Sequence, residues 1–303
     1  MMLAAHILGD KEIIFPEIAA FLTGFWVIDK HVWNASRVQM IVLSVLMAVL
    51  GTCLVLYFPE LSDTEKLLIA LCTGAMLLSI TKTDIYPILS AAALPVVLNV
   101  GSWIYPISVV CLCLCTAIVQ HLMEKTSLRT YNYRNDKSLQ LKTEIIPTKE
   151  YIRLQAIQWI KIIPCITLIS YLAFTSGHRY IILPPLIVCF VEFTKIGSGV
   201  RKQPYLIVLL IFIAALIGTF STQILHLQMG LPIYLSSLIA VLCVFTLFEV
   251  FERRFAPAAA ICLVPNILPL ENQWNFPIEV SIGAAALIII ALMLFPNTSS
   301  KNY

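Results

Sequence analysis

Three glutamates lie in or beside apolar stretches of this sequence: Glu17, Glu192 and Glu279. A carboxylate is costly in an apolar environment, so one that is retained there usually has a functional role. Glu17 and Glu192 fall in comparable short segments, although at different positions, and Glu279 begins a long apolar run. Glu17 also follows Pro16 directly, and a helix N-terminus favours a carboxylate for that reason alone. Both interpretations of Glu17, functional and helix-terminal, are open.

The other residues that could perform acid–base, nucleophilic or metal chemistry are scattered. His121 and Glu124 are the one suggestive pair a helical turn apart, and two ligands do not make a metal site. The nine cysteines lie in apolar runs without a CxxC pair, as packing residues do. There is no HExxH motif, nucleophile elbow or ATP-binding GxxxxGK[ST] loop. We therefore predict that the protein is not an enzyme and has no cofactor or metal. The remaining histidines are His6, His31, His178 and His226.

The composition indicates a polytopic membrane protein. Of the 303 residues, 59% are hydrophobic and 12% are charged, whereas soluble proteins have about 25% charged residues. The mean hydropathy is +0.89. A net charge of +3 is too small and too scattered for nucleic-acid binding. Several runs approach the roughly 20 apolar residues that cross a bilayer as a helix. They are residues 38–58, 65–81, 104–123, 157–175, 204–226, 231–250 and 278–296.

Four further apolar runs are shorter and contain proline: residues 13–28, 86–101, 181–194 and 256–270. We expect them to be short tilted spans, half-helices or re-entrant segments. No removable signal peptide is predicted, because charged residues interrupt the first apolar stretch. One long polar stretch, residues 124–156, divides the chain into two halves.

The two halves share the order of their landmarks. Each begins with a proline-bearing segment, continues through a polar turn and a glycine-containing span, and reaches a basic position before a phrase bounded by two prolines. A further proline starts the last span of each half. We predict an internal duplication of about five membrane segments. The matched stretches are IIFPEIAAFLTGF with IILPPLIVCFVEF, AVLGT with ALIGT, IYPILSAAALP with FAPAAAICLVP, and WIYPISV with NFPIEVS.

Positive charges predict the orientation in the membrane. The linker 124–156 is basic, which places it in the cytoplasm. With five crossings in each half, Lys82 and Arg253 fall on the same side as the linker, and the acidic turn PELSDTE falls outside. Because an odd number of crossings would invert the second copy, the unpaired span 157–175 is needed to keep the two repeats parallel.

The predicted fold is an all-α transmembrane bundle in the cell membrane, with its N-terminus outside and its C-terminus in the cytoplasm. Its parts are a first membrane repeat (1–124), a cytoplasmic basic linker (125–156), a connector transmembrane helix (157–176) and a second membrane repeat (177–303).

The repeated proline phrase is the predicted functional element. Proline inside a helix removes a backbone hydrogen bond, and in lipid the freed carbonyls need partners from protein or water. The small residues between the prolines allow another helix to approach closely. We therefore expect both phrases to be buried at the interface between the repeats, where transporters with internal repeats bind anions at interrupted helices.

Polar residues near the two phrases complete the candidate site. Lys82 and Arg253 would add positive charge, although topology alone also predicts basic residues there. Asn99 and Asn266 would either donate to an anion or, as we favour, satisfy a freed carbonyl. The residues predicted to line a substrate path are Pro87, Ser90, Pro95, Asn99, Pro257, Ala258, Pro265, Asn266, Lys82, Arg253, Glu17 and Glu192.

The second half, residues 180–296, resembles the HPP family of integral membrane proteins, which is named for a His-Pro-Pro motif. The matching parts are ILPPLIVCFVEF, GSGVRKQP, IAALIG and RRFAPAAAICLVP. Residues 13–123 are similar to the family more weakly. The histidine is missing from both copies, where Phe255 and Ile85 stand in its place. Some members of that family are similar to nitrite transporters of chloroplasts and cyanobacteria, so the resemblance implies transport of a small anion.

We therefore predict a gradient-driven transporter or channel for a small anion such as nitrite, embedded in the lipid bilayer, with its path between the repeats. The alternative is a non-transport membrane subunit or anchoring protein that binds a partner through the linker. Either interpretation is compatible with a homo-oligomer or with a membrane partner subunit.

Overall fold

The structure is a computed structural model that describes residues 1–28, 33, 35–125, 148–195, 198–269 and 273–296. All regular secondary structure in these residues is helical. Seven helices among these described residues are long and apolar enough to cross a membrane, in agreement with the seven predicted spans. They include α3 (Arg37–Tyr57), α4 (Asp63–Thr81), α6 (Ile104–Lys125), α8 (Thr148–Thr175), α11 (Ile233–Val250) and α13 (Phe276–Leu294), and α10 (Pro204–Phe220), which the π-helix η5 (Ser221–Gln228) continues.

Large apolar side chains cover the outward faces of the long helices. Ile107, Ile160 and Met293 are 61%, 70% and 74% exposed, respectively. Exposing such a surface to water would be costly, since the transfer of each CH₂ group out of water is favourable by about 0.8 kcal/mol. The surface is therefore compatible with insertion into a bilayer.

Capping side chains define where α3 and α4 begin. The Ser36 hydroxyl accepts a hydrogen bond from the backbone of Gln39, whose side chain accepts one from the backbone of Ser36. Ser62 and Glu65 make the same reciprocal pair at the start of α4. Each pair satisfies two backbone N–H groups that the first helical turn leaves free.

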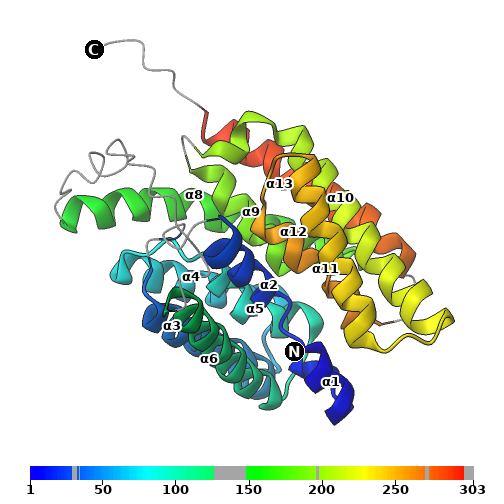
Figure 1. Ribbon diagram of the computed structural model, residues 1–303. Coiled ribbons are helices and arrows are strands. Elements are labelled where there is room, and N and C mark those ends of the chain that lie inside the picture. Colours follow the sequence, from blue (N-terminus) through cyan, green and yellow to red (C-terminus); the bar gives the residue numbers. More distant parts are fainter. Residues whose placement is uncertain (29–32, 34, 126–147, 196–197, 270–272, 297–303) are drawn as a thin grey trace.

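Four short helices lie at the centre of the molecule: α2 (Glu17–Leu22), α5 (Pro87–Leu98), α9 (Pro184–Thr194) and α12 (Ala256–Ile261). The π-helix η2 (Thr23–Ile28) continues α2, and the 3₁₀-helix η6 (Val264–Asn266) follows α12. The 12 residues of α5 extend about 18 Å, less than the roughly 30 Å of a hydrocarbon core. The short helices need not cross the whole hydrocarbon core, because the long helices surround them and nearly all of their residues are buried (Figure 1).

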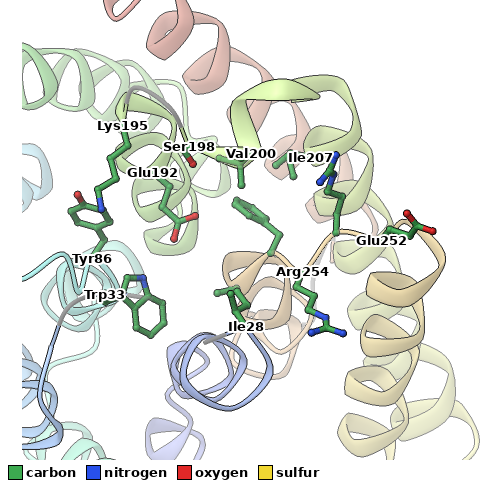
Figure 2. Close-up of a pocket in the computed structure, with 14 residues that line it drawn as sticks. Ile28, Trp33, Tyr86, Glu192, Lys195, Ser198, Val200, Ile207, Glu252 and Arg254 are labelled. Atoms are coloured by element: carbon green, nitrogen blue, oxygen red, sulfur yellow. The ribbon is translucent and has the colours of Figure 1, made fainter. Parts of the chain in front are cut away.

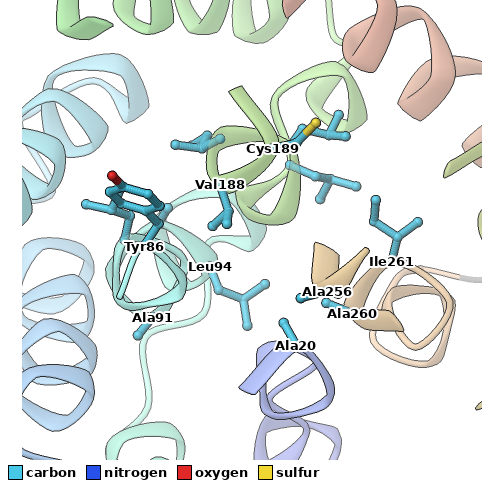
Figure 3. Close-up of a cluster of buried hydrophobic side chains, with 14 of the residues drawn as sticks. Ala20, Tyr86, Ala91, Leu94, Val188, Cys189, Ala256, Ala260 and Ile261 are labelled. Carbon is cyan, nitrogen blue, oxygen red and sulfur yellow. The ribbon is translucent and has the colours of Figure 1, made fainter. Parts of the chain in front are cut away.

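The short helices pair across the two halves of the chain. Helix α2 packs against α12, and α5 packs against α9. Side chains from all four converge on one apolar cluster, which includes Ala20, Ala91, Val188 and Ala260 (Figure 3). The small size of the alanines lets the helices approach closely.

In each half, one glycine allows a long helix to pack directly against a short one. A Cβ atom on Gly51 would lie 2.4 Å from the carbonyl oxygen of Ala92, and one on Gly218 would lie 2.2 Å from that of Cys262. Helix α3 thus crosses α5, and α10 crosses the end of α12, with backbones in direct contact. These are the two glycines that the sequence comparison pairs.

The prolines act differently from the expectation that they interrupt helices. Pro87 is the first residue of α5 and Pro257 the second residue of α12. A backbone N–H at these positions would have no acceptor within the helix, so proline removes no helical hydrogen bond there. Pro95 lies inside α5, but the helix continues to Leu98. In the second half the helix does stop, at Ile261, before Pro265.

A side chain satisfies the carbonyl that Pro95 leaves free, and another side chain satisfies carbonyls beyond the end of α12. Pro95 cannot donate to Ala91, four residues earlier, and the hydroxyl of Tyr105 donates to that carbonyl instead at 2.9 Å. In the second half the Gln273 amide donates to the carbonyls of Pro265 and Leu268 at 3.0 and 3.1 Å. Each bond meets the requirement that buried backbone oxygen atoms have partners.

Replacing Tyr105 by phenylalanine is expected to destabilise the protein by about 1–2 kcal/mol, because the Ala91 carbonyl would be left without a donor. Thermal unfolding in detergent measures this change. Tyr57→Phe is the control, since Tyr57 is 63% exposed. Equal unfolding midpoints for the two variants would contradict the role assigned to the Tyr105 hydroxyl.

Two further differences from the predicted elements are found. A short helix, α1 (Met2–Leu8), precedes the first predicted segment and packs on α11, with the rings of His6 and Tyr234 5.5 Å apart. Helix α8 begins at Thr148, inside the predicted linker. The rest of that linker, residues 126–147, lies outside the described residues, as do His31 and residues 297–303.

Candidate functional site

Basic residues gather at the end of the molecule where α5 and α12 begin, which we call the basic end. They come from separate elements, and hydrogen bonds hold the ends of some of these elements together. Arg201 in η4 (Gly199–Lys202) donates to the carbonyls of Phe193 and Phe295, which joins the ends of α9 and α13. Burial lowers the pKa of its guanidinium, which is nevertheless protonated at neutral pH. The other residues of the basic end are Lys82, Lys195, Arg253 and Arg254.

A cavity of about 360 Å³ opens at the basic end (Figure 2). Tyr86 and Phe255, near the starts of the two repeated phrases, both line it, so the two phrases meet in one place. Figure 2 shows the Glu192 side chain projecting from α9 toward the cavity. The full lining is Ile28, Trp33, Tyr86, Glu192, Lys195, Ser198, Gly199, Val200, Ile207, Glu252, Arg253, Arg254, Phe255 and Ala256.

Acidic side chains neutralise two of the cations that line the cavity. The Lys195 ammonium lies 2.7 Å from a carboxylate oxygen of Asp84 and 5.2 Å from the centre of the Tyr86 ring. Arg254 pairs with Glu249 at 3.0 Å. Their charges are therefore largely compensated within the protein.

Arg253 is the exception. Its Nε and one terminal nitrogen donate to the side-chain oxygen of Gln203 at 3.2 and 3.1 Å, and no carboxylate among the described residues pairs with it. A neutral amide orients the guanidinium but does not cancel its charge. Among the described residues that line the cavity, Arg253 is thus a positioned cation available to an anionic ligand.

The remaining predicted residues near the phrases are distributed between the two ends. Lys82 ends α4 with φ 54° and does not line the cavity. Asn99 ends α5 at the opposite end and is exposed. Asn266 is 2% exposed, and its amide donates to the carbonyl of Leu263 at 3.0 Å. Ser90 and Ala258 are fully buried within their helices.

The sequence analysis missed several residues of this cavity as site residues, including Trp33, Tyr86, Lys195 and Phe255. Lys195 follows Glu192 by about one helical turn at the end of α9. This spacing could have indicated that the two side chains lie on the same side of the helix end. Of the two aromatic residues, Tyr86 stands directly before Pro87 and Phe255 stands two positions before Pro257. Nothing in the local sequence of Trp33 indicates that it reaches the cavity.

A second, smaller pocket of about 80 Å³ lies at the opposite end of α5. Pro95 lines it, together with Lys11, Glu12, Ile14, Leu94, Leu98, Val100, Tyr105 and Ile267. Ala91 and Ala260, each 0% exposed, lie in the apolar cluster between the two depressions. The short helices therefore separate the two ends of the molecule in this structure (Figure 3).

Glu17 is the most deeply buried acid among the described residues, at 1% exposed. It begins α2, as the helix-terminal interpretation predicted, but it lies inside the protein. Neither carboxylate oxygen has a hydrogen-bond partner of ordinary geometry, although the Ser90 hydroxyl on α5 faces the group. Tyr105, which lines the smaller pocket, lies within electrostatic reach of it.

No protein-family model, curated protein or solved structure matches this chain. A functional proposal therefore depends on the geometry of the two pockets and the buried groups between them.

Proposed function

We propose that this protein is a membrane transporter of a small monovalent anion such as nitrite, and that the cavity at the basic end binds the anion. The observation that carries the proposal is the Arg253 guanidinium, which lines the cavity and pairs with no carboxylate in the part of the chain that the structure describes. Guanidinium groups bind small oxyanions through paired N–H donors. The 360 Å³ cavity has ample room for such an anion and its remaining water, since one water takes about 30 Å³ in the liquid.

We further propose that the chain consists of two parallel repeats of about five segments, with the path between them. The reciprocal pairing of α2 with α12 and of α5 with α9 supports this arrangement. The corresponding contacts of Gly51 and Gly218 support it as well. Two similar halves that meet through small side chains can rock against each other, which is how transporters with internal repeats expose a central site to each side in turn.

The resemblance to the HPP family enters this proposal as a prediction of substrate class. Its missing histidine leaves Phe255 at the cavity wall, so an anion would meet Arg253 and an aromatic ring there. Movement down an electrochemical gradient is expected, since no ATP-binding loop occurs in the sequence.

The proposed orientation places the basic end and the linker in the cytoplasm and the N-terminus outside. The concentration of Lys82, Lys195, Arg201, Arg253 and Arg254 at one end supports this orientation. A reporter fused at residue 140 of the full chain should be active only on the cytoplasmic side, and activity on the other side would reverse the topology.

Nitrite uptake by proteoliposomes tests the function. The purified full chain, in liposomes with equal pH on both sides, should take up nitrite from an imposed nitrite gradient well above the rate of protein-free liposomes. If folded protein moves neither nitrite nor formate nor chloride, the proposal fails, and the alternative of a non-transport subunit gains support.

A further inference from the structure

Glu17 lies where three elements meet, and none of them supplies a cation. Helix α5 contributes the Ser90 hydroxyl and α6 contributes Tyr105. The residues of α12, which also packs against α2, are apolar. The hydroxyl of Ser90 lacks a hydrogen-bond partner, as do both oxygens of Glu17.

An unpaired carboxylate in such surroundings is too costly to remain charged, so the group keeps its proton. The protonated carboxyl has one O–H donor and can direct it to the Ser90 hydroxyl, while the carbonyl oxygen can still accept a bond. Losing the proton requires that water or another partner reach the site. Protonation of Glu17 is therefore linked to the packing of α2 against α5.

We propose that Glu17 is a proton-binding site that exchanges its proton through the smaller pocket beside Tyr105, and that one proton crosses the membrane with each anion. This inference rests on the proposed function. The carboxylate takes up H⁺ from the side of the smaller pocket when α2 and α5 separate. It releases H⁺ toward the basic end after the rearrangement that also releases the anion.

The energetics of anion movement favour a proton as the coupled ion. Import of a monoanion into a cell with a negative interior costs about 2.3 kcal/mol for each 100 mV. A proton that travels in the same direction cancels this cost, because the pair carries no net charge.

Glu17→Gln separates coupling from transport. Glutamine has the shape of a protonated glutamic acid but cannot release a proton, so the variant is expected to fold with an unchanged thermal midpoint. In proteoliposomes with an imposed pH gradient, nitrite accumulation should fall at least tenfold. Nitrite exchange with equal pH on both sides should stay within about threefold of the original protein. Glu60→Gln is the matched control, because Glu60 is exposed in the turn between α3 and α4.

Infrared spectroscopy tests proton binding without any transport. The original protein at neutral pH should show the C=O stretching band of a protonated carboxyl, which shifts in D₂O and is absent from Glu17→Gln. A missing band would overturn the proton site even if nitrite is transported. Loss of exchange together with accumulation, or accumulation driven by sodium instead of pH, would overturn proton coupling. Absence of nitrite transport by the original protein would overturn the proposed function and the coupling with it, and the infrared band would still decide whether Glu17 binds a proton.

Discussion

Adding one methyl group at Gly218 (G218A) is expected to destabilise the protein by about 2–3 kcal/mol, at the upper end of the cost of overpacking. The new Cβ would lie 2.2 Å from the carbonyl oxygen of Cys262 and 2.8 Å from its carbon. Both are backbone atoms, so no side-chain rotation relieves the clash and two helices must move apart. Gly51→Ala should have a similar effect through the backbone of Ala92, 2.4 Å away. Thermal unfolding in detergent measures both changes.

Gly199→Ala is the control for these substitutions. A Cβ atom there would meet nothing within 4 Å, and the backbone has no positive φ. Alanine is also the better helix former by about 1 kcal/mol, so a destabilised Gly218→Ala or Gly51→Ala variant must owe its loss to the clash. Unchanged midpoints in all three variants would show that the close helix crossings do not determine stability.

Arg253→Gln is expected to lower the initial rate of nitrite uptake at least tenfold, with most of the effect in KM. Tenfold corresponds to about 1.4 kcal/mol of binding, which is within the usual range for a hydrogen bond to a charged group. Arg254→Gln should lower the rate less than threefold, because Glu249 already pairs with that guanidinium. The two variants remove the same charge from neighbouring positions of one cavity.

Arg253→Lys adds a second comparison. Lysine keeps the charge but loses the planar donor pair that Gln203 orients, so an intermediate rate is expected. Equal losses for Arg253→Gln and Arg254→Gln would mean that the cavity attracts anions only through its general field. In that case raising the ionic strength should abolish the difference from the original protein.

The long helices follow directly from the sequence. A run of about 20 apolar residues has to satisfy its backbone internally in lipid, and a helix does this without any other part of the chain. All seven predicted spans are therefore present as helices. Capping residues such as Ser36 and Ser62 also act locally, which is why they mark helix starts in the sequence. The internal duplication and the family resemblance remain predictions.

The effect of Pro95 on its helix was predicted incorrectly for a physical reason. Whether a proline ends a helix in an apolar interior depends on what satisfies the freed carbonyl. At Pro95 the donor is Tyr105, from another helix, and α5 continues past the proline. The sequence shows the proline but not its compensating partner.

The sequence by itself determined the membrane class, the spans and the concentration of candidate chemistry in the short segments, because hydropathy and backbone satisfaction are local properties. Only the tertiary structure decided which charges remain available. Lys195 is neutralised by Asp84, 111 positions away in the chain. Among the described residues, Arg253 pairs with the amide of Gln203 and with no carboxylate, and Glu17 pairs with no cation. Pairing of this kind depends on how helices distant in sequence pack together, because a charge is cancelled or kept by its neighbours in space.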